Sequence, residues 1–282
     1  YHPRFNSPEA DIILISSEET AYRVHSFTLR NTCGYFRNLF SHGQAGPVSA
    51  PTFSGSSVAT MPESDAPLSQ VLALLCGLSY TPSTSIDELD EALSLAERWE
   101  APGPISIIRN CITSPIFLTE QPLRLYAVAT KFGWDEEAKL ASTETLTLDL
   151  YQDAYKEDLA KISPRALMKL LRLHRKRREG LKAFLDSADN FELGNLARCP
   201  CPGCETELDN HTWRELKWRM VFEMDKRALG DSLYGLDMEE WPEATACWSA
   251  TCSKADCARM NYDKTHTLRK IKNCIDNLPL CI

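Results

Sequence analysis

The apolar positions near the N-terminus change their period within a short stretch of chain. A continuous apolar run at residues 11–16 is followed by polar turn residues and then by alternating apolar positions at Tyr22 and Val24, a pattern that predicts a β-hairpin. From Asn31 onwards the apolar positions recur every three or four residues, as they do on one face of a helix. His25 therefore stands where a strand is expected to give way to a helix.

Most of the remaining chain carries the helical period. Residues 42–57 are rich in Gly, Ser and Pro and predict a loop. Helices are predicted over residues 69–78, 86–99, 105–111, 123–132, 136–148 and 159–185. The last of these has Ser163 as a cap before Pro164. Because hairpin and helices are mixed at first and only helices follow, we expect a domain boundary near Ser114, with antiparallel helical hairpins after it.

Two further apolar stripes lie near the C-terminus. Their members are Trp213, Leu216, Trp218, Met220, Val221 and Phe222 in the first stripe, and Leu268, Ile271, Ile275 and Leu278 in the second. Periodic apolar faces are more often core than interface, so the stripes predict two core helices that close over the neighbouring cysteines. A groove for a partner is the alternative interpretation.

Composition and charge exclude two classes of partner. The chain has 282 residues, 43% of them hydrophobic and 25% charged, which is enough to bury a core in about two domains. Its 31 Lys and Arg against 39 Asp and Glu give a formal net charge of −8, which argues against general attraction to nucleic acid phosphates. No apolar run approaches the roughly 18 residues of a membrane span. Neither nucleic acid nor a membrane is therefore an expected partner.

One basic run departs from this acidic balance. Residues 169–182 hold a candidate basic patch made of Arg172, Arg175, Lys176, Arg177 and Arg178. Such a run could bind nucleic acid or a nuclear-import receptor. Because the rest of the chain is acidic, we favour the solvated face of a helix.

Eight of the eleven cysteines fall within residues 199–281. Cys201 and Cys204 have the spacing of a zinc knuckle, and Cys252 and Cys257 form a wider second pair. These four are the predicted ligands of a structural zinc ion, and the alternates are Cys199, Cys247 and His211. Disulfide bonds and unpaired buried thiols stay open as alternatives. No other cofactor is indicated.

No catalytic residue is predicted. His25 has only Ser26 and Cys33 nearby as candidate nucleophiles, without a Gly-rich elbow or an oxyanion-hole loop. We interpret it as a structural residue that fixes the strand-to-helix corner. The enzymatic alternative pairs a thiol of the C-terminal cluster with His211 or His266, but no signature of a cysteine enzyme accompanies these residues.

The ordered elements of residues 6–113 resemble the BTB/POZ domain. The resemblance rests on an Asp at the first strand, an aromatic-x-Val-His hairpin, a helix ending in Phe-x-x-Leu-Phe, a hydrophobic-x-Glu strand and an Ala-x-x-aromatic helix. These motif positions are Asp11, Tyr22, Val24, His25, Phe36, Leu39, Phe40, Glu63, Ala96 and Trp99. The resemblance implies an α+β fold whose outer surface binds other polypeptides, and it implies no chemistry.

The helical part has a resemblance of its own. Residues 121–146 and 170–181 resemble the extension of uncharacterised BTB proteins from mushroom-forming (basidiomycete) fungi. The expected architecture is therefore an α+β, BTB/POZ-like domain at 6–113, an all-helical extension at 114–190 and a Cys-rich helical region at 191–282. The expected function is a non-enzymatic protein–protein interaction adaptor inside the cell, in the nucleus or the cytoplasm.

The expected partners are other proteins. A homodimer and a cullin ubiquitin-ligase scaffold both stay open, although the chain departs from the patterns typical of each. Only ten residues precede Asp11, where swapped dimers usually have an extra helix, and residues 42–57 contain no acidic residue, where cullin-binding relatives often have one. A nuclear transcription or chromatin-associated factor is the further alternative. Because the sequence opens at Tyr1 rather than Met, a leader stays open too.

Overall fold

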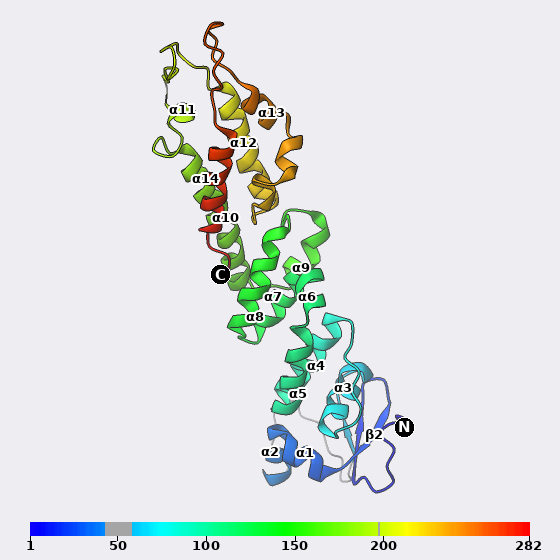
Figure 1. The fold of residues 1–282 in the computed structure, drawn as a ribbon. Coiled ribbons are helices and arrows are strands. Elements are labelled where there is room, and N and C mark those ends of the chain that lie inside the picture. Colours follow the sequence, from blue (N-terminus) through cyan, green and yellow to red (C-terminus); the bar gives the residue numbers. More distant parts are fainter. Residues whose placement is uncertain (43–57, 197) are drawn as a thin grey trace. The chain divides into compact units, whose positions relative to one another are not determined.

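The structure is a computed structural model. It describes residues 1–42, 58–196 and 198–282. The chain divides into two compact units, Tyr1–Phe117 and Leu118–Ile282, whose elements are labelled in Figure 1. The predicted loop at residues 42–57 falls almost wholly outside the described residues.

A three-stranded sheet lies in the first unit. Strands β1 (Ile12–Ile15) and β2 (Ala21–Val24) pair antiparallel with Ile13 opposite Arg23, which confirms the predicted hairpin. Strand β3 (Val58–Thr60) pairs parallel with β1, so the order is β2-β1-β3. Alternate residues point into the core, as the period of a strand requires. The buried ones are Ile12, Leu14, Tyr22, Val24 and Ala59.

Helices follow β2 and β3 along the chain and complete the first unit. They are α1 (Ser26–Thr32), α2 (Gly34–His42), α3 (Asp65–Leu75), α4 (Ile86–Arg98) and α5 (Pro102–Ile112), and α6 (Pro115–Glu120) crosses the division between the units. Helix α4 has the predicted apolar face, with Leu89, Leu93 and Ala96 buried. Its first turn is capped by Ser85, whose Oγ accepts from the amide of Glu88.

Several helices begin earlier than their periodicity predicts, and α1 and α3 do so by the most residues. Helix α1 starts at Ser26 rather than near Asn31, because its seven residues bury only Leu29 and so carry no apolar repeat. Helix α3 starts at Asp65 rather than Ser69. Apolar periodicity in a sequence therefore predicts only those helical turns that bury apolar residues in the core.

The strand-to-helix corner is held by Asp11 and not by the side chain of His25. Asp11 Oδ1 accepts from the amide of Ser26 at 2.7 Å, and the Ser26 hydroxyl donates to Oδ2. This hydroxyl lowers the pKa of Asp11. His25 occupies the N-cap position of α1, but its side chain is exposed and caps no amide. The predicted place of His25 was right, and the predicted role of its side chain was wrong.

Helix α2 begins where two backbones approach closely. The amide of Gly34 donates to the carbonyl of Glu100 at 3.1 Å, and the amide of Tyr35 donates to that of Trp99 at 3.2 Å. A Cβ on Gly34 would overlap the Glu100 side chain. The turn after α4 thereby satisfies the first amides of α2, which have no partner inside their own helix.

The second unit is helical. Its α-helices are α7 (Pro122–Lys131), α8 (Asp135–Glu144), α9 (Lys156–Ala160), α10 (Pro164–Asp186), α11 (Glu192–Asn195), α12 (His211–Lys226), α13 (Pro242–Ser249) and α14 (Lys264–Asp276). Short 3₁₀ turns are η1 (Thr145–Thr147), η2 (Asp153–Tyr155), η3 (Asp231–Leu233) and η4 (Leu236–Glu240). Helix α10 begins at the predicted cap, since Ser163 Oγ accepts from the amide of Ala166 and Pro164 is the first helical residue. The predicted helical segment 159–185 is therefore divided between α9 and α10.

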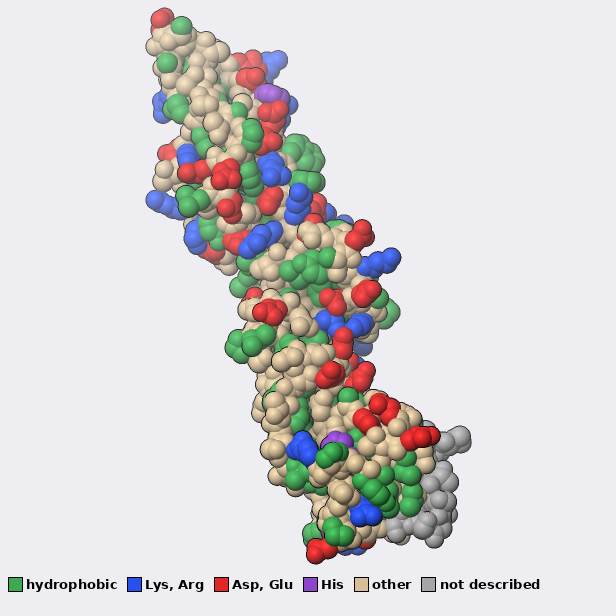
Figure 2. Space-filling view, turned by 90° about the vertical axis from the view of Figure 1, so that its right-hand side faces the viewer, with side chains coloured by type: hydrophobic (Ala, Val, Ile, Leu, Met, Phe, Trp, Pro, Cys, Tyr) green, Lys and Arg blue, Asp and Glu red, His purple; other side chains and the backbone are tan. Residues whose placement is uncertain are grey.

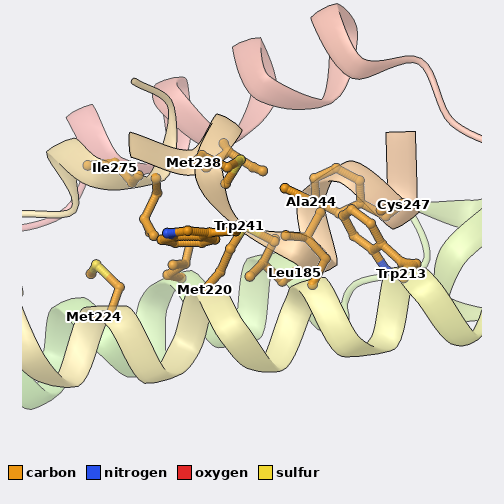
Figure 3. Packing of buried hydrophobic residues seen from close by; sticks show 14 residues of the cluster. Leu185, Trp213, Met220, Met224, Met238, Trp241, Ala244, Cys247 and Ile275 are labelled. Carbon is orange, nitrogen blue, oxygen red and sulfur yellow. The ribbon is translucent and has the colours of Figure 1, made fainter. Parts of the chain in front are cut away.

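Helices α10, α12, α13 and α14 share one core. Figure 3 shows Trp241 and Trp213 towards opposite ends of it, with Leu185 between them. Helix α12 contributes buried residues at steps of three and four, namely Trp213, Leu216, Met220 and Met224. Trp218 and Phe222 were predicted to belong to this core and do not: they are 66% and 53% exposed, because they lie off the buried stripe of the helix.

Within the described ranges, no helix combines the length and the apolar character that crossing a membrane demands. Figure 2 shows Lys and Arg side chains interspersed with Asp and Glu on the face that it presents.

Candidate metal centre

Four thiols converge in the second unit. The Sγ atoms of Cys201, Cys204, Cys252 and Cys257 all lie within 4.8 Å of one another. Cys201 Sγ is 3.7 Å from Cys257 Sγ, and Cys204 Sγ is 3.5 Å from Cys252 Sγ. Cys201 and Cys204 form a sequence pair between α11 and α12, and Cys252 and Cys257 form a second one between α13 and α14. Residues separated by about fifty positions therefore form one cluster.

Each pair sits at the tip of a short hairpin. An isolated bridge joins Pro200 to Glu207 in the first hairpin and Thr251 to Met260 in the second. The leading cysteine donates its amide across each hairpin: Cys201 to the carbonyl of Thr206 and Cys252 to that of Arg259, both at 2.8 Å. We call these hairpins the first and second knuckles.

The two knuckles turn in the same way although their spacings differ. The amides of Cys204 and Glu205 both donate to the carbonyl of Cys201, and those of Cys257 and Ala258 both donate to the carbonyl of Lys254. The residue after the second cysteine is left-handed in each knuckle, with φ of 58° at Glu205 and 42° at Ala258. The second knuckle thus accommodates two extra residues ahead of the same turn, which explains its wider spacing.

The sulfur positions fit a tetrahedral ion. A Zn–S distance of about 2.3 Å places the sulfurs of a regular tetrahedron about 3.8 Å apart. The separations of 3.5 and 3.7 Å are close to that value. Leu193 and Leu208 pack against the four cysteines. A set of four thiolates around one position is the donor set of structural zinc.

Hydrogen bonds prepare one of the thiols to lose its proton. The hydroxyl and the amide of Thr206 lower the pKa of Cys204 to about 6. At Cys252 a hydrogen bond from the backbone amide of Lys254 favours the thiolate, but burial and the neighbouring thiols together raise the pKa to about 11. The negative charge of an ionised Cys204 therefore opposes ionisation of the other thiols. A divalent cation bound between the four sulfurs would favour their ionisation instead.

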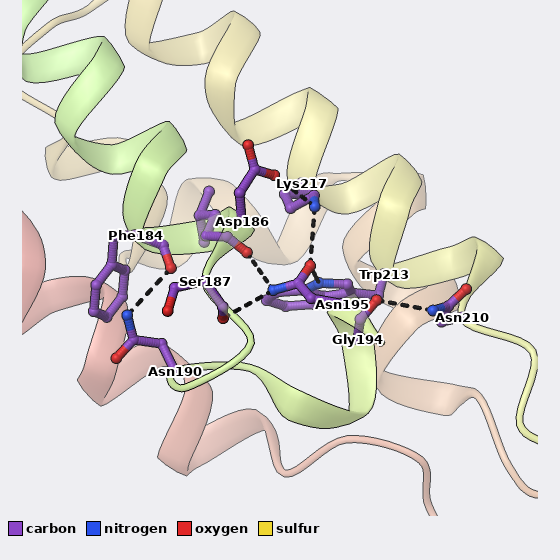
Figure 4. A network of polar contacts seen from close by, with 10 residues as sticks. Phe184, Asp186, Ser187, Asn190, Gly194, Asn195, Asn210, Trp213 and Lys217 are labelled. Carbon is purple, nitrogen blue, oxygen red and sulfur yellow. Dashed lines mark hydrogen bonds and ion pairs between the residues drawn. The ribbon is translucent and has the colours of Figure 1, made fainter. Parts of the chain in front are cut away.

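A polar network fixes the chain on both sides of the first knuckle (Figure 4). Asn195 uses its whole amide, with Nδ2 donating to two carbonyls and Oδ1 accepting from two side chains. The partners are Leu185 O at 2.6 Å, Ser187 O at 3.2 Å, Trp213 Nε1 at 3.3 Å and Lys217 Nζ at 2.9 Å. On the other side, Asn210 Nδ2 donates to Gly194 O at 2.9 Å. The knuckle is thereby anchored to α10 and α12.

The alternate ligands lie away from the four thiols. Cys199 is buried at the base of the first knuckle, where its carbonyl accepts from the amide of Leu208. Cys247 is part of the core in Figure 3. His211 is exposed at the start of α12 with Nε2 at 3.2 Å from Glu215. Among the described residues, the metal-ligand cluster contains none of the three.

The motif positions of the first unit fall into two groups. Tyr22, Val24, Phe36, Ala96 and Trp99 are buried. Phe36 meets Trp99 edge-to-face at 5.0 Å between ring centroids. Leu39 and Phe40 are half-buried.

Glu63 has a separate role in this unit. It follows β3 rather than lying within it, and its carboxylate pairs with Arg98 at 2.9 Å. Glu63 therefore links the end of the sheet to α4.

The candidate basic patch is divided by the structure. Arg177 is fully buried, whereas Arg172, Arg175 and Lys176 are exposed. The apolar stripe of α10 contains Leu173 and Leu181, and Arg177 lies midway between them. Arg177 was predicted to lie on the solvated face of the helix, which was wrong, and this spacing is the sequence signal that could have identified it as buried.

Comparison with protein families places the first unit. The model of the BTB/POZ domain matches residues 4–114, and this stretch is a BTB/POZ domain. Its small mixed sheet with surrounding helices, followed by a helical region with a cysteine cluster, confirms the expected fold class. A comparison with curated proteins found none that matches the chain.

Proposed function

We propose that this protein is a non-enzymatic adaptor that binds other polypeptides through its BTB/POZ domain. The match of residues 4–114 carries the proposal, because domains of this kind generally mediate protein–protein interaction. Exposed apolar side chains provide contact points on this unit. Phe27 on α1 is 67% exposed and Ile107 on α5 is 42% exposed.

Affinity purification of the full chain from its native host tests the proposal. Phe27→Glu and Ile107→Glu place a charge on the BTB/POZ surface, and Leu236→Glu is the control, since Leu236 is an exposed apolar residue of the second unit. We expect captured partners to be lost with a change in the first unit and kept with Leu236→Glu. A partner set that responds only to Leu236→Glu would contradict the proposal.

Narrower versions of this function differ in what the same purification yields. A substrate adaptor of a cullin ubiquitin ligase predicts a cullin among the captured proteins. A homodimer predicts twice the chain mass in solution. A nuclear transcription or chromatin-associated factor predicts DNA binding that weakens steeply with salt.

We also propose that Cys201, Cys204, Cys252 and Cys257 hold a structural zinc ion that joins the two knuckles. The convergence of the four Sγ atoms supports this site. Metal analysis of protein purified without chelator should give about one zinc per chain. Cys204→Ser should lose the metal, whereas the exposed Cys281→Ser should keep it. Metal-free protein with intact knuckles would contradict the site.

The same proposal includes the location and the domain plan. The protein acts in the nucleus or the cytoplasm, and its segments at 6–113, 114–190 and 191–282 act as binding domain, helical extension and metal-pinned region. The extension relates it to BTB proteins of mushroom-forming fungi. Fluorescent tagging of the full chain in host cells tests the location.

A further inference from the structure

The basic run on α10 has partners for two of its arginines. Arg177 is buried and donates only to backbone carbonyls. Arg178 is exposed in part and pairs twice, with Asp225 at 2.5 Å and with Glu179 at 2.6 Å. Its positive charge is therefore compensated within the chain.

Two arginines of the same run form no ion pair, although the charge of Arg175 helps that of Arg178 to lower the pKa of Glu179. Arg172 and Arg175 are exposed, and neither forms an ion pair with any described residue. Three residues apart, the two side chains lie on neighbouring positions of one helix face.

That face borders a cavity of about 520 Å³. Arg172 and Arg175 form part of its α10 wall, and α12 supplies Met224 and Asp225. Leu150 and Tyr151, which precede η2, also line the cavity. Much of the lining is apolar and open to solvent. Tyr151 is 80% exposed and Met168, one turn before Arg172, is 50% exposed.

We infer that this cavity binds a single oxyanion, a carboxylate or a phosphate monoester, which a partner polypeptide carries beside an apolar side chain. A guanidinium group presents paired N–H donors that match the oxygens of either anion. Tyr151, Met168 and Leu171 form the apolar surface against which the neighbouring side chain packs. The site lies in the second unit and does not depend on the BTB/POZ domain.

The charges around the cavity favour one anion over a polyanion. Asp225 lines the cavity and Glu179 adjoins it through Arg178, so successive phosphates of a nucleic acid would meet both carboxylates. Of the three arginines that line the cavity, only Arg172 and Arg175 form no ion pair, which limits the counterions that nucleic acid binding there could release. An isolated carboxylate or phosphate next to apolar atoms meets neither difficulty.

Fluorescence anisotropy with three labelled peptides tests the site on the full chain. The peptides have the sequence Gly-Leu-X-Leu-Gly, where X is glutamate, phosphoserine or serine. Arg172→Gln with Arg175→Gln removes the two guanidinium groups of the cavity that form no ion pair. The matched control is Lys169→Gln with Lys176→Gln, which removes the same charge from exposed positions of α10 that do not line the cavity.

We expect the glutamate or the phosphoserine peptide to bind and the serine peptide not to bind, and the tighter of the two identifies the anion. The arginine pair should weaken binding by about tenfold or more, and the lysine pair by less than about twofold. Unchanged thermal unfolding of both variants confirms that they fold. Equal losses in the two pairs, tighter binding of duplex DNA than of any peptide, or no binding of either anionic peptide would each overturn the inference.

Discussion

At the scale of single residues, Arg177 is the clearest case of a side chain whose role differs from its type. Its guanidinium group donates to Ala228 O at 2.6 Å, Leu229 O at 2.8 Å, Pro279 O at 2.9 Å and Leu278 O at 3.2 Å. These carbonyls follow the C-terminal ends of α12 and α14. The negative ends of two helix dipoles thus stabilise a buried cation that has no carboxylate partner.

Replacing Arg177 should therefore destabilise the second unit strongly. Arg177→Met keeps much of the volume but leaves four carbonyls without donors, and we expect a loss of about 3 kcal/mol in the free energy of unfolding. Lys176→Met, at the exposed neighbouring position, should change it by less than about 0.5 kcal/mol. Urea unfolding followed by tryptophan fluorescence measures both. Similar midpoints for the two variants would contradict the role given to Arg177.

His174 gives the same region a dependence on pH. Burial, reinforced by the charge of Arg177, lowers the pKa of His174 to about 4. The unfolded chain binds the proton near pH 6.5, so protonation favours unfolding once the pH falls below that value. The stabilisation is complete above pH 6.5 and is lost as the pH falls towards 4. His174 should account for roughly 2 kcal/mol of lost stability between about pH 7 and about pH 5.

His174→Gln isolates this contribution. Glutamine keeps a polar group near Thr145 Oγ1, which lies 3.3 Å from His174 Nε2, but it does not titrate. The free energy of unfolding should then fall less steeply with pH in the variant than in the parent. The comparison is made by urea unfolding at matched pH and metal content, and parallel pH profiles would show that another group is responsible.

Arg177 also shows what residue type conceals. Arg177 occupies a position in the apolar repeat of α10, but an arginine within a basic run is expected to be exposed. The same limit applies to Asp11, whose capping of Ser26 depends on a contact between two elements. Spacing predicted the four clustered cysteines because a knuckle is a local structure, whereas the cavity beside Arg172 needs three separated segments.

At the scale of elements, the sequence predicts those helices and strands whose apolar residues recur at a regular spacing and pack against a core. The hairpin and α4 were predictable for this reason. Helices α1 and α13 each bury one or two residues and offered no period. Helix α12 was located correctly, but its two exposed aromatics were assigned to the core because residue type outweighed their angular position.

The turns of the knuckles are elements that substitution can improve. Ala258 adopts φ of 42°, a conformation that costs a residue with a Cβ about 1 kcal/mol and costs glycine almost nothing. Ala258→Gly should therefore strengthen metal retention in a competition with a chelator, by up to about fivefold. Ala255→Gly, in the same knuckle without a positive φ, should weaken retention or leave it unchanged. Equal effects of the two changes would show that the turn geometry is not limiting.

At the scale of the whole molecule, the mixture of strands and helices followed by helices alone was enough to predict the class of fold. The partner could not be predicted in the same way, because an interaction surface consists of exposed residues such as Phe27 that carry no periodic signal. The charge of the chain did narrow the class of partner. At the cavity beside α10, two arginines without an ion pair lie near Asp225 in a chain of net charge −8, and this favours recognition of a single anion over a polyanion.

Metal removal should act on one of the two units. The four cysteines, the two knuckles and the Asn195 network all belong to residues 118–282. Without an ion the thiolates repel one another, so the knuckles should open while the core of Trp213 and Trp241 keeps its apolar contacts. Hydrogen–deuterium exchange with and without a zinc chelator should show faster exchange at residues 198–210 and 250–263, and unchanged exchange in β1, β2 and α4. Restoring zinc should reverse the change. Faster exchange of the sheet, or no change at the knuckles, would show that the ion does not act as a local clamp.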